Sequence, residues 1–331
     1  MIRSNLHNFC GSIGQHGILL KCRRLALRLL LFSLTSCCLL LPFASEAFSA
    51  QRFAVLYPEV PSPYRAIFDT IIQGIKSLEN AEYSLYPLSE DQNIEQLRKR
   101  LEKSQVKGII ALGKRGFLTA QQLNMPLPIT IGALPLIPNG ISGISLSADP
   151  EQIFSRLKSL VPDTKQVFVV YSPKANGWLL PYAEKAARNY GLNLTAFSAE
   201  DLRETMHLYR QLLDENRGRS TTIWLPLDKL TADEDIVLPM LLQEAWNRDL
   251  VIVSSKPTHV QRGALFSLYP DNFGLGQELA EHLQQQQKLG KTGVVPLKKL
   301  HLAVNMRTAA HLGLNFSNSQ LQSFDLSFPA R

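Results

Sequence analysis

The sequence predicts an α/β fold of two lobes, each with a parallel sheet flanked by helices. Short apolar segments typical of buried strands alternate with amphipathic helical segments, and this alternation is typical of parallel sheets covered on both faces. The pattern begins again near mid-chain, where Phe168–Pro173 (FVVYSP) resembles Phe53–Pro58 (FAVLYP). A chain of 331 residues, 45% of them hydrophobic, is also long enough for two lobes that each bury a core.

Residues 1–47 have the pattern of a secretory signal peptide. Basic residues at positions 21–28 precede the apolar run Leu29–Leu41, and the small residues Ser45 and Ala47 follow it. This order predicts export to the periplasm, with cleavage after Ala47. A membrane anchor is one alternative, although so short an apolar run is a poor span for a bilayer. Acylation of Cys37, within the lipoprotein-like segment Leu34–Cys37, is another.

The composition after the leader argues against several classes of protein. All four cysteines precede Ala47, so the mature chain has no disulfide, thiol nucleophile or cysteine metal site; they are Cys10, Cys22, Cys37 and Cys38. Cleavage also removes five basic residues and one acidic residue, which lowers the formal charge from +7 to +3. The apparent basicity is thus partly a targeting signal, and we expect no nucleic-acid partner.

In the first half, strands and helices are expected in strict alternation. Ser62 and Pro63 predict a cap and a first-turn proline for the first helix. A charged helix over Asn93–Ser104 and a helix from Gly113 through Leu123 follow. The strands around them are expected at Phe53–Tyr57, Tyr83–Tyr86, Gly108–Leu112 and Pro128–Ile131.

The second half begins with a helix that Asp149 caps and that has Pro150 in its first turn. Further helices are expected near Pro181–Tyr190, Asp201–Asn216 and Glu234–Arg248. The strands between them are expected at Val167–Tyr171, Leu192–Phe197, Thr222–Leu225 and Val251–Val253.

The segment 261–283 combines a strand, a crossing loop and a helix. Ala264–Leu268 is a short apolar run, and Asp271 or Asn272 can cap the helix that follows. Gly274 and Gly276 leave the first turns without side chains, so that a backbone or a ligand can approach closely. The apolar stripe of this helix is expected to be Phe273, Gly276, Leu279, Ala280 and Leu283.

Three motifs resemble those of a known family. They are Arg262–Leu265 (RGAL) with the following Asp271 and its helix, Val304–Leu314 (VNMRTAAHLGL), and Ile141–Pro150 (ISGISLSADP). Together with the order of elements, they resemble the substrate-binding proteins of ABC importers, in particular the group of tryptophan- and tyrosine-type periplasmic binding proteins.

The resemblance implies a type I periplasmic-binding-protein-like fold, in which the chain crosses three times between lobes that enclose a ligand cleft. The crossings would fall near Gly143, Gly263 and Lys298. Lobe 1 would comprise residues 48–143 and 264–297, and lobe 2 residues 144–263 and 298–331. The expected partners are a small-molecule ligand and an ABC permease in the inner membrane, with the protein itself a monomer.

Candidate ligand-binding residues follow from the predicted sheets, because ligands of parallel sheets bind beyond the carboxyl ends of the strands. The candidates are Tyr57, Glu59, Ser62, Lys114, Arg115, Ser172, Asn176, Asp228, Ser254, Tyr269 and Asp271. Several have an ordinary alternative role: Ser62, Asn176 and Asp271 as helix caps, Lys114 and Arg115 as solvated surface residues.

The ligand is less well defined than the fold. Where the family has a Thr-Pro type pair after the third strand and Asp-Pro after the fourth, this chain has Lys114-Arg115 and Leu134-Pro135. Two basic residues suit an anionic ligand at least as well as an aromatic amino acid.

Catalytic motifs give no support to an enzyme. The sequence contains no nucleophile elbow and no P-loop, and its mature histidines have no metal-ligand spacing. We therefore expect a non-enzymatic binding protein of an importer, without cofactor or metal. A periplasmic sensor that imports nothing is the nearest alternative, and an exported two-domain enzyme a more distant one.

Overall fold

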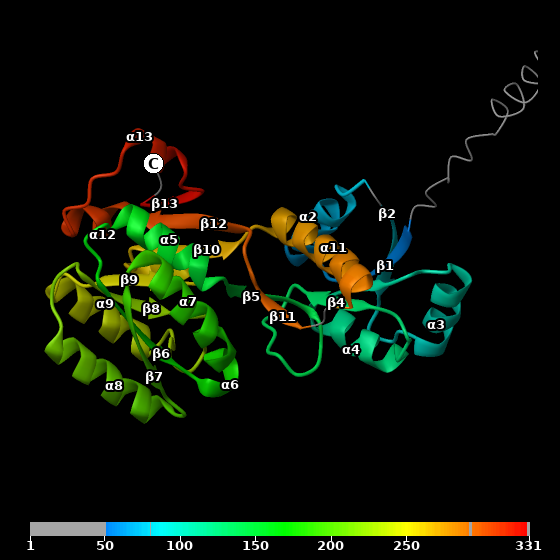
Figure 1. The fold of residues 1–331 in the computed structure, drawn as a ribbon, viewed down its shortest axis with the longest axis horizontal. Coiled ribbons are helices and arrows are strands. Elements are labelled where there is room, and N and C mark those ends of the chain that lie inside the picture. The colour runs from blue at the N-terminus through cyan, green and yellow to red at the C-terminus, as the bar shows by residue number, and fades with distance from the viewer. Residues whose placement is uncertain (1–50, 80, 291–292, 330–331) are drawn as a thin grey trace, which may run out of the picture. The chain divides into compact units, whose positions relative to one another are not determined.

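The computed structural model describes residues 51–79, 81–290 and 293–329. The predicted signal peptide, its cleavage site and all four cysteines lie outside the described residues. The described chain forms two sheets, each flanked by helices (Figure 1). This arrangement confirms the predicted α/β class and is that of a type I periplasmic-binding-protein-like fold.

The first sheet has six strands in the order β11-β5-β4-β3-β1-β2, and every pair is parallel. The strands are β1 (Gln51–Pro58), β2 (Ala81–Leu88), β3 (Ile109–Leu112), β4 (Ile129–Gly132), β5 (Gly143–Ala148) and β11 (Val294–Leu297). Its helices are α2 (Tyr64–Lys76), α3 (Ile94–Lys103), α4 (Gly113–Leu123) and α11 (Asn272–Leu289).

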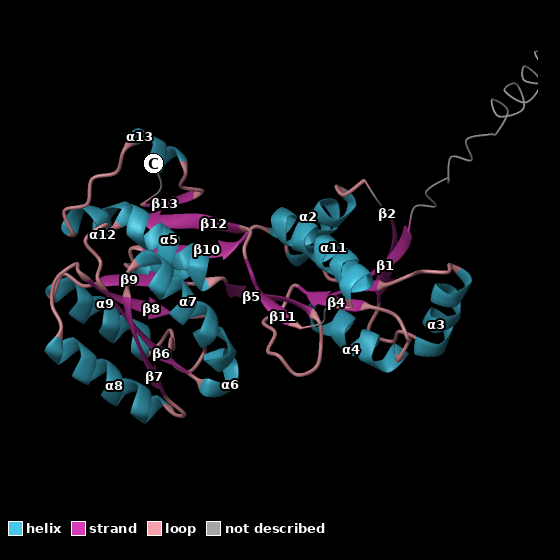
Figure 2. Cartoon of the chain, in the orientation of Figure 1, coloured by secondary structure: helices cyan, strands magenta, loops and turns pink. Residues whose placement is uncertain are grey.

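The second sheet has seven strands in the order β13-β12-β10-β9-β8-β6-β7. They are β6 (Gln166–Tyr171), β7 (Asn193–Ser198), β8 (Thr221–Leu225), β9 (Val251–Ser254), β10 (Phe266–Pro270), β12 (Leu300–Asn305) and β13 (Leu326–Phe328). The helices are α5 (Pro150–Leu160), α6 (Pro173–Asn176), the 3-10 turn η1 (Gly177–Leu179), α7 (Leu180–Tyr190), α8 (Leu202–Glu215), α9 (Val237–Asn247), α10 (Pro257–Arg262), α12 (Met306–His311) and α13 (Asn318–Gln322) (Figure 2).

The predicted strands and helices all occur, within a few residues of their expected limits. The central strands are buried on both faces because helices cover both, as in β3 and β8, where every residue is buried. One pairing departs from the expected parallel pattern: β10 and β12 are antiparallel.

The chain changes sheets later than predicted at two of three places. Residues 143–148 are still strand β5 of the first sheet, paired with β4 and β11. The strand after Gly263, β10, pairs with β9 and β12 of the second sheet, although we expected it in lobe 1. The sheet therefore changes after Ala148, after Pro270 and between Leu297 and Leu300, and the third of these lies close to the predicted Lys298.

Two glycines allow helices α2 and α11 to pack backbone against backbone (Figure 1). A Cβ on Gly276 would lie 2.0 Å from the carbonyl oxygen of Ile71, and one on Gly74 would lie 2.0 Å from that of Phe273. The close approach predicted for Gly276 is thus confirmed. Phe273 departs from the predicted apolar stripe: its side chain is 39% exposed, while the other stripe residues are buried.

Two predicted helix starts have different outcomes. Asp149 caps α5 by accepting a hydrogen bond from Glu151 N–H at 3.0 Å, with Pro150 in the first turn, as predicted. Ser62 does not cap α2, because Pro63 occupies the N-cap position and no side chain accepts a hydrogen bond there. Among the described helices, none combines the length and apolar character needed to cross a bilayer.

Candidate ligand-binding site

Three of the predicted site residues meet at the carboxyl edge of the second sheet. Asp228 follows β8, and Ser172 and Asn176 belong to the turn and short helix that follow β6. The N–H of Ser172 and the Nδ2 of Asn176 both donate to Asp228 Oδ2, at 2.9 and 3.1 Å. Because β6 and β8 are neighbours in the sheet, their following loops meet at this edge.

The Asp228 carboxylate is largely occupied by the protein itself. Its other oxygen, Oδ1, accepts from Leu230 N–H at 2.8 Å and from Thr231 N–H at 3.4 Å. A carboxylate offers about four acceptor positions, so the two oxygens have little capacity left for a ligand. Asp228 thus ties two loops together.

Asn176 presents an unused acceptor in the same cluster. Its side chain is 3% exposed, and its Nδ2 is held by Asp228 and by the carbonyl of Leu227. Among the described residues, no group donates to the Asn176 Oδ1. A buried oxygen without a donor is costly unless something else supplies one.

A second polar cluster lies at the end of β9. Ser254 is 2% exposed, and its Oγ lies 2.8 Å from Nδ1 of the buried His259 and accepts from Lys256 N–H at 3.2 Å. Lys256 Nζ donates to Glu234 Oε1 at 2.6 Å. Burial, with some help from the charge of Lys256, lowers the pKa of His259 to about 4, so the ring is neutral near pH 7.

The contacts of Ser254, His259 and Glu234 resemble a catalytic triad only in composition. His259 Nε2 lies 3.7 Å from Glu234 Oε1, beyond hydrogen-bond distance. Ser254 Oγ is already bonded to His259 and to Lys256 N–H, which leaves it poorly available as a nucleophile. A histidine with a pKa of about 4 is also a weak base at neutral pH. The hydrogen bonds of this cluster instead stabilise the loop after β9.

The predicted residues of the first lobe are more exposed. Glu59, Ser62 and Lys114 are exposed, and Tyr57 is half-buried at the end of β1. Arg115 has a defined structural role, because it donates to the carbonyl of Leu88 at 3.1 Å and to Glu90 Oε1 at 2.9 Å. It therefore joins α4 to the end of β2.

Tyr269 and Asp271 lie where the chain leaves the second sheet. Asp271 caps α11, since its Oδ1 accepts from Gly274 N–H at 3.0 Å, as predicted. The Tyr269 ring lies 5.4 Å from that of His301, and burial, together with the charge of Asp325, raises the pKa of its hydroxyl. His301 Nδ1 is 2.9 Å from Asp325 Oδ1.

Trp178 brings this edge of the second lobe against the first lobe. Trp178 lies two residues after Asn176, and its side chain packs against a cluster of first-lobe residues that includes Ile131 and Leu136. Its Nε1 donates to the carbonyl of Ala175 at 3.2 Å. The loop after β6 therefore carries both an unused buried acceptor and a contact between the lobes.

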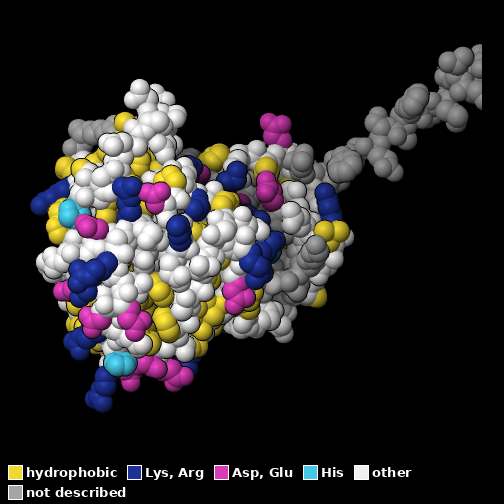
Figure 3. All heavy atoms as spheres, turned by 60° about the vertical axis from the view of Figure 1, so that its left-hand side comes forward, with side chains coloured by type: hydrophobic (Ala, Val, Ile, Leu, Met, Phe, Trp, Pro, Cys, Tyr) yellow, Lys and Arg dark blue, Asp and Glu magenta, His cyan; other side chains and the backbone are white. Residues whose placement is uncertain are grey.

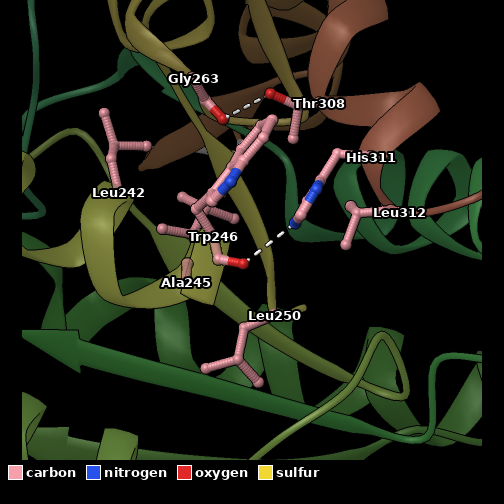
Figure 4. Close-up of a pocket in the computed structure, with 9 residues that line it drawn as sticks. Leu242, Ala245, Trp246, Leu250, Gly263, Thr308, His311 and Leu312 are labelled. Carbon is pink, nitrogen blue, oxygen red and sulfur yellow. Dashed lines mark hydrogen bonds between the residues drawn. The ribbon is translucent and has the colours of Figure 1, made fainter. Parts of the chain in front are cut away.

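A separate pocket of the second lobe is too small for a ligand. It lies between α9 and α12 and has a volume of about 10 Å³, enough for one water molecule at most (Figure 4). The rings of Trp246 and His311 stack there with their centroids 3.6 Å apart, and His311 Nε2 lies 3.0 Å from the carbonyl oxygen of Trp246. The described residues also contain no cluster of three potential metal ligands.

Charged side chains form no large patch of one sign on the face shown in Figure 3, where basic and acidic residues are interspersed.

The sequence did not predict His259 and Glu234 as neighbours of Ser254. His259 follows Ser254 closely, but Glu234 comes from the loop before α9, and no pattern links it to the other two.

The two sheets, with a polar edge on the second, have the architecture of a type I periplasmic-binding-protein-like fold. Residues 135–325 match the family model described as ABC transporter substrate binding protein. This chain therefore belongs to the ABC transporter substrate-binding family. Among curated proteins, none matches it.

Several solved structures are similar to this chain at low identity. A ligand-free, open substrate-binding protein with adhesive properties from Clostridium difficile is 14% identical, with 85% of this chain and 100% of that chain covered and a TM-score of 0.55. A protein from Streptococcus pneumonia in complex with L-Trp is 18% identical, with 85% and 100% covered and a TM-score of 0.48. A conserved domain protein from Vibrio cholerae is 17% identical, with 84% and 99% covered and a TM-score of 0.47.

Proposed function

We propose that this protein is the exported substrate-binding component of an ABC importer. It would bind a small ligand between its two lobes in the periplasm and deliver it to a permease in the inner membrane. Membership of the substrate-binding family supports the binding role. The leader pattern of residues 1–47 supports export.

The match of residues 135–325 to the substrate-binding family carries the proposal. We infer the position of the site from Asn176, whose buried Oδ1 lacks a donor in the described part of the chain. It lies beyond the carboxyl end of β6, where ligands of parallel sheets bind. The neighbouring Trp178 packs on the first lobe, so a ligand at this place would be within reach of both lobes. A ligand N–H or O–H would supply the missing donor.

The predicted residues divide into two proposed groups. We propose direct ligand contacts for Tyr57, Glu59, Ser62, Ser172, Asn176 and Tyr269. Arg115, Asp228, Ser254 and Asp271 would support the site indirectly, because their side chains are already bonded within the protein. The ligand would be an amino acid or another small polar or anionic solute, and the complex of the Streptococcus pneumonia relative with L-Trp makes aromatic amino acids a first choice for testing.

Binding would act through a shift between open and closed forms. A ligand that touches both lobes only when they are closed favours the closed form by its difference in affinity for the two. The permease would then recognise that form. No catalytic step is needed, and we propose none.

A ligand screen tests the proposal. The purified mature protein is heated with amino acids, nucleosides, vitamins and anions, and a ligand at a hundredfold over its Kd should add about 2.7 kcal/mol to stability. Small-angle scattering should then give a smaller radius of gyration with that ligand. An unchanged radius at saturation would contradict closure.

Two variants localise the site. Asn176→Ala should weaken binding tenfold or more, because it removes the unused acceptor. Asn193→Ala, at an exposed asparagine of the same sheet, is the matched control and should bind normally. Recovery of the ligand chemically unchanged after long incubation separates a binder from an enzyme. Transport by a reconstituted permease separates an importer from a sensor.

A further inference from the structure

A polar pocket lies within the first lobe, beside the carboxyl ends of β2 and β3. Its volume is about 400 Å³, which is in the range of about 300–1,000 Å³ found for small-molecule sites. The loop after β2, the start of α3 and one face of α4 form its walls, and Ser89, Gln92, Thr119 and Gln122 supply uncharged polar groups. The pocket can therefore make several hydrogen bonds to a hydroxylated molecule.

The charges in the pocket leave one cation available. Glu90, Lys114 and Arg115 all line it. Arg115 pairs with Glu90 at 2.9 Å, so these two charges largely cancel. Within residues 51–79, 81–290 and 293–329, Lys114 makes neither an ion pair nor a side-chain hydrogen bond. Its ammonium group is thus free to bind an anion.

We propose that this pocket is a second binding site, distinct from the site between the lobes, and that it takes a small hydroxylated carboxylate. Lys114 would bind the carboxylate through a charge-assisted hydrogen bond. The side-chain amides of Gln92 and Gln122 and the hydroxyls of Ser89 and Thr119 would bind the ligand's hydroxyl groups. Leu118 and Ile94 supply an apolar part of the wall.

The location of the pocket sets this site apart from the one that drives closure. All of its lining residues lie between Ser89 and Gln122, in one lobe. A ligand held by one lobe alone binds the open and closed forms equally well and does not shift the equilibrium between them. Occupancy should therefore leave the lobe arrangement unchanged.

Gluconate, sorbitol and glucamine test the proposal, because these three polyols carry a carboxylate, an alcohol and an amine at one end. Isothermal calorimetry should detect gluconate binding, with the other two at least tenfold weaker. Lys114→Gln should reduce gluconate affinity about tenfold or more. Lys103→Gln changes an exposed lysine of α3 outside the pocket and should leave the affinity unchanged.

Several outcomes would overturn the proposal. They are no detectable gluconate binding, equal binding of sorbitol, or full affinity in the Lys114→Gln variant. A fall in the radius of gyration with gluconate would place it between the lobes instead. None of these outcomes affects the ligand screen or the Asn176→Ala test, so the proposed function can stand if this second site fails.

Discussion

The carboxyl edges of the two sheets are built differently, although both follow parallel strands. At the second edge, Asn176, Asp228 and Ser254 are buried, and their side chains are hydrogen-bonded within the protein. At the first edge, Glu59 and Ser62 are exposed, and neither side chain makes a hydrogen bond within the described residues. The second edge is thus fixed before any ligand arrives, whereas the first can adjust its side chains to the ligand.

Removal of the Asp228 carboxylate should have the largest effect. Asp228→Ala leaves the N–H groups of Ser172 and Leu230 and the Nδ2 of Asn176 without their acceptor. Each unsatisfied buried donor costs about 1–3 kcal/mol, so we expect a loss of about 4 kcal/mol in the free energy of unfolding. Urea denaturation measures it. A loss below about 1 kcal/mol would show that the second edge is not held by this residue.

The second edge should also respond to pH through His259. The pKa of His259 is about 4 in the folded protein, whereas its ordinary value of 6.5 applies in the unfolded chain. Between these two pH values the unfolded chain binds a proton that the folded chain does not. Stability is therefore fully present above pH 6.5 and falls as the pH drops towards 4, by about 3 kcal/mol in total.

Histidine variants separate this contribution from other titrating groups. His259→Gln should have a flatter dependence of unfolding free energy on pH between 6.5 and 4. His207→Gln, at an exposed histidine of the same lobe, should keep the slope of the parent protein. Equal slopes in all three proteins would refute the assignment to His259.

Asp271 lies between the two lobes and should have an intermediate effect. As the cap of α11, it should tolerate Asp271→Asn, while Asp271→Ala should cost about 1 kcal/mol of stability. Calorimetry with the screened ligand tests whether the residue also binds it. Normal affinity in Asp271→Asn would confirm a cap alone, and a loss of roughly 2 kcal/mol in binding would indicate a direct contact with a charged ligand group.

The smallest effects on stability are expected at the first edge. Glu59→Ala and Ser62→Ala should each change the free energy of unfolding by no more than about 0.5 kcal/mol, as is usual for exposed residues outside a network. The same two variants should still weaken ligand binding if these side chains contact the ligand. A marked loss of stability in either would remove the distinction between the two edges.

The strands and helices could be predicted from the sequence because their cores follow simple periods. Runs such as Val251–Val253 and the repeat of FAVLYP as FVVYSP reflect local burial. Two of the sheet changes differ from those that the resemblance implies near Gly143 and Gly263, because β5 still pairs in the first sheet and β10 in the second. Gly143 instead lets β5 lie close to the carbonyl of Ile131, where a Cβ would be 2.2 Å away, and Gly263 follows the end of α10.

The site could be predicted only as a set of loop ends. Ser172, Asn176 and Asp228 were each predicted because they follow the carboxyl end of a strand, and the structure brings all three together. Their hydrogen bonds depend on the register between β6 and β8, which the sequence does not specify. Only these hydrogen bonds show that both Asp228 oxygens already accept donors from the protein, while Asn176 Oδ1 accepts none.

The docking of α11 on α2 makes the first lobe discontinuous along the chain. Leu275, Leu279 and Leu283 belong to its core together with Phe53 and Ile71, although the entire α5–β10 segment lies between the two groups in sequence. A chain that leaves the ribosome N-terminus first therefore exposes the apolar side of α2 until α11 has been made. The N-terminal portion alone cannot complete its core, so folding of the first lobe must await nearly the whole polypeptide.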